Sequence, residues 1–468
     1  MTMKESKSIK KSNRAFKYGI APRYISIIAF LTLGAQLFGY MEAELLNTYI
    51  DHVLNLQPIF IAIMVSSSAV MGLIFLFVFG IFSDNTRSRF GRRRPYLLVG
   101  GVVAGVGLFL FGFSGNYLFC YLIDVVIIGI ASNSFYAAQR SLVPDLVEVQ
   151  YRGRVNSILS IMSVIGLIFP VVLTLLANEF FTIPDPESTT GGVLLTQFGH
   201  QILLSIGGGT IVVCGLIGFF FLKNSVSAGN LPPKKNFGTE LRDTFNFSEL
   251  KKHKEVFKLI IANTLYMAGV NAVMSYLFNF LFSLGLETTD LIIMLAIAAP
   301  GLFIAIMVLG RLTDKIGRKK IIPPTLIISS IGFFLVPFIT GGTQINTVLF
   351  GLVLALILVG LIGVTVPLNT WTQDLLPEHK RGQFLGIFNI VNTVSQIIGS
   401  MSAGVVATLL TGIVARPYAW IFAIVPIFFL ASLPIFLKVK ETLKPKITTL
   451  GEIKRDGENL EDNQPSNS

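Results

Sequence analysis

The sequence predicts an all-α membrane protein whose twelve transmembrane helices form two pseudo-symmetric six-helix bundles. Three observations carry this prediction: an apolar composition, twelve apolar segments of membrane-spanning length, and an internal repeat. Of the 468 residues, 52% are hydrophobic and 13% are charged, whereas a soluble domain is about one quarter charged. The composition therefore excludes an ordinary soluble enzyme, and the many Phe, Leu, Ile and Val residues exclude intrinsic disorder.

Twelve segments are long enough to cross a bilayer, whose core of about 30 Å needs roughly 20 apolar residues per helix. Glycine clusters within these segments, Gly101 with Gly105 and Gly207 to Gly209, indicate close helix packing. The predicted spans are 24–46, 57–82, 95–114, 117–142, 154–178, 198–222, 257–283, 289–310, 321–340, 347–371, 383–410 and 417–437.

The basic residues are sorted to one side of the predicted membrane. All but one of the 37 Lys and Arg residues lie on the same side, either before the first span, after the last, in alternate loops or, as for Arg140 and Lys258, at the span ends beside those loops. Arg416 is the exception. Positively charged loops remain in the cytoplasm, so we expect both termini to be cytoplasmic, in a protein of the cell membrane. This sorting accounts for the net charge of +11 and leaves no support for nucleic-acid binding.

The chain repeats itself, which predicts its domain organisation. Gly80-Ile-Phe-Ser-Asp84 returns 230 residues later as Gly310-Arg-Leu-Thr-Asp314. Two such halves are the arrangement of transporters that rock about a central substrate site. The predicted organisation is a cytoplasmic N-terminus at 1–23, an N-terminal bundle at 24–222, a cytoplasmic linker at 223–256, a C-terminal bundle at 257–440 and a disordered cytoplasmic tail at 441–468.

The repeated loops resemble a known family signature. Gly80-x-x-x-Asp84 with Gly91-Arg92-Arg93-Arg94, and the second copy from Gly310 to Lys320, resemble the loop motif of the major facilitator superfamily. The longer first loop, Ser83 to Pro95, resembles that of the glycoside-pentoside-hexuronide cation symporters, and most closely that of the plant and animal sucrose-transporter-like proteins. The resemblance implies secondary transport of a sugar or glycoside.

Few ionisable residues lie within the predicted spans, and each is a candidate for a functional role. The acidic ones are candidates for proton coupling. A carboxyl group removed from water can bind and release a proton near neutral pH. Glu42 and Glu44 are two residues apart in the first span, so at most one can face a central cavity squarely. Glu42 is preferred because it resembles the acidic residue of the animal relatives. The alternative is a carboxylate at the membrane surface.

Asp124 in the fourth span is the third candidate for proton coupling. It precedes Arg140 by sixteen residues, whereas the plant transporters that the sequence resembles have an Asp eleven residues before the Arg. The second span has no acidic residue before Asp84, unlike the sodium-binding melibiose-transporter branch. Protons are therefore preferred to sodium as the coupling ion.

Polar side chains within the spans are candidates for binding a sugar, which needs many neutral hydrogen-bonding partners. Asn389, Asn392 and Gln396 form one stripe along the predicted eleventh helix. The resemblance gives Arg140 a substrate-binding role, and the alternative for Arg140 is a charge that stabilises the end of its helix. For the amides the alternative is hydrogen bonding between helices. The candidates are Arg140, Asn133, Asn263, Asn271, Asn389, Asn392 and Gln396.

Charged residues at the loop ends are candidates for gating. In the family resemblance, acidic residues pair with basic clusters in the outward-open state, and the pairs break on inward opening. The alternative is that these charges only set the topology. The candidate gating residues are Asp84, Arg92, Asp145, Arg152, Asp314, Arg318, Asp374 and Arg381.

The predicted function is therefore proton-coupled symport of a sugar or glycoside by alternating access. A proton-coupled exporter of amphipathic small molecules is the alternative. The sequence lacks G-x-S-x-G, H-E-x-x-H and P-loop motifs, so we expect no enzyme activity, no cofactor and no metal site. The expected partners are the sugar, a proton and the lipid bilayer, and the protein is expected to be a monomer.

Overall fold

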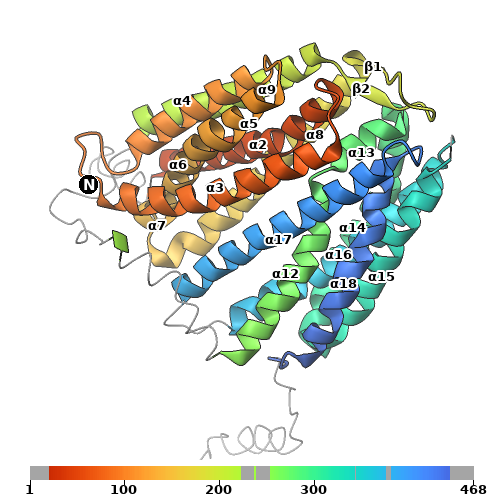
Figure 1. Cartoon of the computed structure of the whole chain (residues 1–468). Coiled ribbons are helices and arrows are strands. Elements are labelled where there is room, and N and C mark those ends of the chain that lie inside the picture. Colours follow the sequence, from red (N-terminus) through yellow and green to blue (C-terminus); the bar gives the residue numbers. More distant parts are fainter. Residues whose placement is uncertain (1–20, 223–236, 239–252, 343, 376–380, 443–468) are drawn as a thin grey trace, which may run out of the picture.

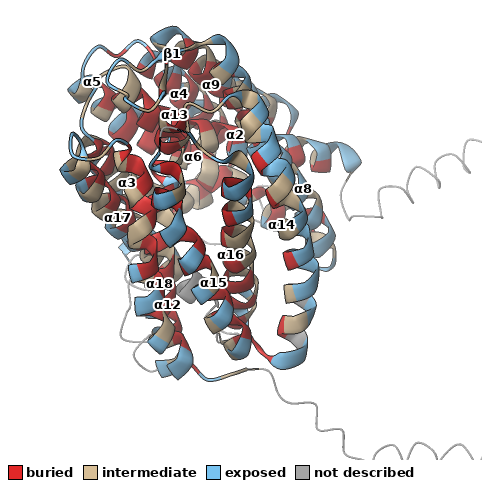
Figure 2. Ribbon diagram, turned by 90° about the vertical axis from the view of Figure 1, so that its right-hand side faces the viewer, coloured by how far each residue is buried: buried red, intermediate tan, exposed pale blue. Residues whose placement is uncertain are grey.

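The computed structural model describes residues 21–222, 237–238, 253–342, 344–375 and 381–442. In this part of the chain, twelve helical segments are long and apolar enough to cross a membrane. They match the predicted number of spans, and the exposed side chains along them are large and apolar. Phe303 of the eighth span, for example, is 66% exposed, and Figure 2 shows exposed residues in pale blue along the long helices. Such surfaces are stable in lipid rather than in water, so the chain is an integral multi-pass membrane protein.

Among the first six spans, one is irregular, and a short β-hairpin lies between the fifth and the sixth (Figure 1). The fourth span is not one α-helix, because a π-helical segment, η1, interrupts it. The elements are α2 (Pro22–His52), α3 (Pro58–Asn85), α4 (Arg94–Phe111), α5 (Tyr117–Tyr121), η1 (Leu122–Ile128), α6 (Gly129–Arg140), α7 (Leu142–Leu146), η2 (Val149–Tyr151), α8 (Arg152–Phe180), the antiparallel strands β1 (Thr182–Pro184) and β2 (Val193–Leu195), and α9 (Gln197–Phe221).

The second six spans contain one break. The predicted span 257–283 is interrupted between α12 and α13, at Ser275 and Tyr276. The elements are α12 (Lys254–Met274), α13 (Leu277–Leu284), α14 (Thr288–Ile316), α15 (Arg318–Thr340), α16 (Thr347–Leu375), α17 (Arg381–Leu410), the 3-10 turn η5 (Pro417–Trp420) and α18 (Ile421–Lys438).

Each half packs mainly on itself. In the first half α4 lies along α9, and α2 packs against α8 and α9. In the second half α16 packs against α14 and α15, and α12 against α17 and α18. The halves meet along α3 and α17, which run side by side across the middle of Figure 1.

The two ends of the molecule differ, and we name them by their residues. The hairpin end carries β1, β2 and α13. The basic end carries the loop from Arg87 to Arg94 and the start of α15 at Arg318. Between the described residues, the hydrogen bonds that join the two halves lie toward the hairpin end. Examples are the Ile59 amide donating to Thr408 Oγ1 at 2.9 Å, and Ser66 Oγ to Ser400 Oγ at 3.2 Å.

Glycines set the closest approach of α4 and α9. A Cβ atom added at Gly208 would lie 2.5 Å from the carbonyl oxygen of Gly105, whereas one added at Gly209 would meet nothing within 4 Å. The first position therefore requires glycine, because a backbone atom of the neighbouring helix occupies the space. This agrees with the packing role that the sequence indicated.

Candidate functional site

A cavity of about 340 Å³ lies between the two halves. Helices α2, α3 and α6 with η1 supply one wall, and α12 and α17 supply the other. Its lining combines carboxyl groups, amides and hydroxyls with a few apolar side chains, and Lys, Arg and His are absent from it. The polar lining residues are Glu42, Glu44, Asn47, Ser68, Asp124, Ser132, Asn133, Tyr136, Asn271, Ser275 and Gln396.

Asp124 reaches this cavity from the π-helix η1. The amide of Gly129 donates to the carbonyl oxygen of Asp124, five residues earlier, which is the hydrogen bond that widens the turn. Asp124 is 3% exposed and interacts with the hydroxyl of Ser68 on α3. A single π turn of this kind commonly occurs at a functional position, because the extra residue changes which side chain faces inward.

The three predicted proton-coupling residues all line the cavity. Glu42 lies close enough to Asp124 for the two carboxylates to repel each other. Glu42 and Glu44 both line it, although they are two residues apart on one helix. The reason is that the cavity borders three consecutive residues of α2, from Glu42 to Glu44. Glu44 is buried, and its carboxylate interacts with Tyr40.

The predicted amides divide into two groups. Asn133, Asn271 and Gln396 line the central cavity. Asn133 also donates to the carbonyl of Gly129 at 2.7 Å, which fixes its side chain. Asn263 is buried within the second half, and the exposed Asn389 and Asn392 lie nearer the basic end than Gln396; none of the three lines the cavity. The amide stripe of α17 therefore meets the cavity only at Gln396.

Arg140 lies outside the central cavity. It lines a separate cavity of about 330 Å³ toward the basic end, together with Gln139, Arg152 and Asn156. Its nearest link to the central site is Tyr136, one turn earlier on α6, which interacts with both Glu42 and Arg140. The substrate-binding role expected for Arg140 therefore lacks a direct contact with the central cavity in this conformation.

The predicted gating residues form ion pairs within each half. Asp145 accepts from Arg92 at 2.5 Å and from Arg93 at 2.8 Å, and Arg93 also pairs with Asp84 at 2.5 Å. In the second half Arg318 pairs with Asp374 at 2.5 Å. Since both partners of each pair belong to the same half, a rigid rotation of the halves leaves the pairs intact. This differs from the expected pairs that break on inward opening.

Two gating candidates cannot be placed with the others, and one has a different role. The side chains of Asp314 and Arg381 lie outside the described residues. Arg152 donates to the carbonyls of Val147 and Pro144, at 3.0 and 2.9 Å, and so caps the short helix α7. Arg93, which sequence reasoning did not single out, is the centre of the first network.

Several cavity residues were also missed. Asn47, Ser68, Ser132, Tyr136 and Ser275 line the central cavity, but small polar side chains are common in membrane helices and carry no distinguishing signal. Among the described residues, no group of three or more His, Cys, Asp and Glu side chains could hold a metal ion. The chemistry available is therefore proton binding by carboxyl groups and hydrogen bonding by amides and hydroxyls.

Comparisons with known proteins agree with this architecture. A sucrose transport protein of Arabidopsis thaliana is 23% identical over 255 residues, 49% of this chain and 42% of that protein. A class H tetracycline resistance protein of Pasteurella multocida is 28% identical over 161 residues, 34% of this chain and 38% of that protein. The chain thus spans less than half the length of these two curated relatives.

The fold and the family have independent support. The solved structure of the nucleoside transporter NupG aligns with a TM-score of 0.67 and 15% identity, over 89% of this chain and 98% of that one. The sequence profile of the Major Facilitator Superfamily matches residues 26–400. The predicted fold is therefore confirmed, and the matching family and the structural neighbour are membrane transporters rather than enzymes. The chain belongs to the major facilitator superfamily.

Proposed function

We propose that this transporter is a symporter that couples the entry of a sugar or glycoside to the entry of protons. The observation that carries the proposal is the composition of the central cavity. It combines the carboxyl groups of Glu42, Glu44 and Asp124 with four amides, two from each half, and no basic side chain lines it. Amides and hydroxyls bind the neutral hydroxyl groups of a sugar, and the enclosed carboxyls bind the proton.

The proposed orientation places the basic end in the cytoplasm of a cell-membrane protein. Support comes from the charge sorting, since positively charged loops are retained on the cytoplasmic side. With this orientation the hydrogen-bonded hairpin end is the outer end, and the conformation is inward-facing. The rigid units are the bundles 24–222 and 257–440, joined by the linker 223–256, and the protein acts as a monomer.

In the proposed cycle, the carboxyl pair Glu42 and Asp124 takes up a proton while the cavity is open to the outside. The proton removes the repulsion between the two carboxylates, so the loaded cavity can close around the sugar. The halves then rock, and the sugar and the proton leave toward the basic end. With the carboxyl pair deprotonated, the halves rock back to the outward-open state. Only a ligand with different affinity for the two states can drive such a cycle, and the proton supplies this difference.

Uptake by proteoliposomes tests the function. A panel of radiolabelled sugars and glycosides is assayed with and without an inward proton gradient. We expect at least one neutral sugar to accumulate only with the gradient, and Glu42→Gln to abolish the accumulation. Glu148→Gln is the matched control, because this carboxylate is exposed and lies outside the central cavity. Accumulation that ignores the gradient would overturn the coupling.

The second candidate is a proton-coupled exporter, favoured by the match to a tetracycline resistance protein. The same vesicles distinguish it. An exporter moves an amphipathic compound against the direction of proton flow and leaves the neutral sugars behind. A symporter moves the sugar with the protons.

A further inference from the structure

A second cavity lies at the hairpin end, beyond the central one. Its volume is about 840 Å³, and residues of both halves line it. Asp51 of α2 and Asn279 of α13 belong to this lining, whereas Asn47 and Ser275, each four residues earlier on the same segments, line the central cavity. A single layer of side chains on these two segments therefore separates the two cavities.

The layer is held by hydrogen bonds between the halves. Asn47 Nδ2 donates to the carbonyl oxygen of Ser275 at 2.9 Å, and Asn279 Nδ2 donates to Asp51 Oδ2 at 2.8 Å. The partners in each bond are 228 residues apart, close to the repeat length of 230. The layer therefore joins nearly equivalent positions of the two halves, which meet where the pseudo-symmetry axis passes between them. Asp51 also interacts with the hydroxyl of Tyr418, which, like Ser275 and Asn279, belongs to the second half.

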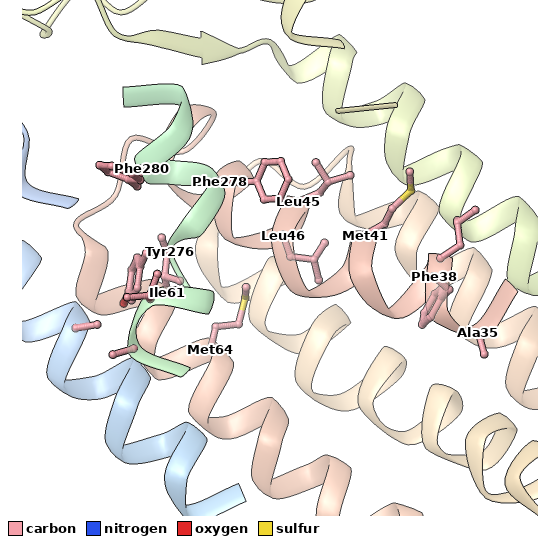
Figure 3. Packing of buried hydrophobic residues seen from close by; sticks show 14 of the residues in the cluster. Ala35, Phe38, Met41, Leu45, Leu46, Ile61, Met64, Tyr276, Phe278 and Phe280 are labelled. Atoms are coloured by element: carbon pink, nitrogen blue, oxygen red, sulfur yellow. The ribbon is translucent and has the colours of Figure 1, made fainter. Parts of the chain in front are cut away.

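The break between α12 and α13 makes this layer possible. A helix that ends leaves carbonyl groups without intrahelical partners, and the Ser275 carbonyl is bonded by Asn47 of the other half. At the same break, the buried Tyr276 reaches the other half, where its hydroxyl donates to the carbonyl of Pro58 on α3 at 2.8 Å. Figure 3 shows Tyr276 and Phe278 projecting from this segment toward residues of α2 and α3, including Leu45 and Ile61.

One atom of the layer has an unmet requirement. Asn279 is 1% exposed, and its Oδ1 atom is buried without a hydrogen-bond partner. Buried polar atoms in folded proteins are nearly always paired, and an unpaired acceptor destabilises the state that buries it. The unpaired Oδ1 therefore makes the closed layer less stable than a fully hydrogen-bonded layer would be.

We propose that Asp51, Asn279 and Asn47 form the gate between the central cavity and the hairpin-end cavity. This proposal rests on the proposed function in one respect, because it takes the two cavities as parts of one transport path. The gate is closed in this structure. Opening breaks the Asn279–Asp51 and Asn47–Ser275 hydrogen bonds and joins the two cavities. The proton-coupling residues are not part of the gate, since Glu42, Glu44 and Asp124 line only the central cavity.

Pulsed electron paramagnetic resonance in nanodiscs tests the gate without any transport assay. Spin labels are attached at Ile183→Cys and Ile413→Cys, exposed residues on opposite halves at the hairpin end. Cys120 and Cys214, both buried, are first replaced by Ser. We expect a short label separation in the parent protein. Asp51→Ala and Asn279→Ala should each raise the ratio of open to closed molecules by roughly tenfold, the equivalent of one lost hydrogen bond.

Two further variants separate the gate from a general loss of structure. Asp51→Asn keeps an oxygen that can accept from Asn279, so it should keep the closed separation. Glu187→Gln is the matched control at the same end, because Glu187 is exposed and accepts from Asn55 within its own half. An unchanged distribution in both alanine variants, or opening caused equally by Glu187→Gln, overturns the gate. Because the readout is a distance, absence of sugar uptake would overturn the proposed function and leave the gate standing.

Discussion

Arg318 donates to Asp374 at 2.5 Å, at the place in the second half where Arg92 and Asp145 pair in the first. Asp374 follows Asp145 by 229 residues, so the internal repeat visible in the sequence is also a repeat of ion pairs. Each pair ties the start of one helix to the end of another within the same half. Its effect is to make each half rigid, which a rocking mechanism requires, whereas the hydrogen bonds at the hairpin end join the halves.

Replacing Asp145 should destabilise the protein more than replacing Asp374. The Asp145 side chain is 11% exposed and holds two arginines, while Asp374 is 38% exposed and holds one. Asp145→Asn leaves Arg93 partly unpaired in a buried site, which destabilises by about 3 kcal/mol. Asp374→Asn loses a solvent-screened pair worth about 1 kcal/mol or less. Thermal unfolding in detergent measures the order, and equal shifts would contradict this assignment.

The contact of α4 with α9 predicts a sharp difference between adjacent glycines. Gly208→Ala places a methyl group against the Gly105 carbonyl, which cannot move without displacing a helix. We expect a loss of about 2 kcal/mol in stability, typical of overpacking. Gly209→Ala adds its methyl group where nothing lies within 4 Å and should be neutral. The two variants differ by one position, so similar unfolding temperatures for both would show that the helices are not in close contact there.

Asp124→Asn should separate coupling from translocation. The amide is isosteric with a protonated carboxyl, so the loaded state can still form and rock, but no proton is released. We therefore expect loss of gradient-driven accumulation together with retained sugar exchange across the vesicle membrane. The two assays run on the same vesicles, with Glu148→Gln as the control. If exchange disappears along with accumulation, Asp124 has a structural or substrate-binding role instead.

The sequence predicted where the helices and the carboxyl groups lie. It did not predict the local changes in helix geometry that decide which side chains face one another. The twelve spans follow from apolar length alone. Glu42, Glu44 and Asp124 are candidates because carboxyl groups are rare in such spans, and the preference for Glu42 came from the family resemblance. The π turn at Asp124 and the break at Ser275 do not follow, because a periodicity of 3.6 residues assumes a regular helix. Arg140 shows the same limit, since its place within a span says nothing about which of two cavities it lines.

Arg416, the single basic residue predicted on the far side of the membrane, should hold the hairpin end together. It is 2% exposed, and its guanidinium donates to carbonyl oxygens of both halves, including Thr190 at 2.9 Å, Ser283 at 3.2 Å and Thr340. Burial lowers the pKa of Arg416. An arginine nevertheless remains protonated at physiological pH, so burial destabilises the cation without making it titrate, and the carbonyls offset this effect.

Replacement of Arg416 should therefore weaken the closed hairpin end at every pH in the physiological range. Arg416→Gln loses most donors and should raise the open fraction in the spin-label measurement, whereas Arg416→Lys keeps the charge with fewer, less well-placed donors and should fall between. Burial lowers the folded-state pKa of Arg416, but an arginine remains protonated throughout this range, so stability should not change with pH between about 6 and 8 on its account. A pH-dependent difference between Arg416→Gln and the parent protein would contradict this role.

The α17 stripe offers the most direct test of the sugar site. Gln396 lines the central cavity, whereas Asn392, one turn nearer the basic end on the same stripe, does not. Removing a neutral hydrogen-bonding group from a bound ligand weakens binding by about 1 kcal/mol, so Gln396→Ala should weaken sugar affinity about fivefold. Asn392→Ala should leave affinity unchanged, because its side chain is exposed outside the cavity. Equilibrium binding of the transported sugar measures both. A larger effect of Asn392→Ala than of Gln396→Ala would contradict this assignment and move the binding site along α17 toward the basic end.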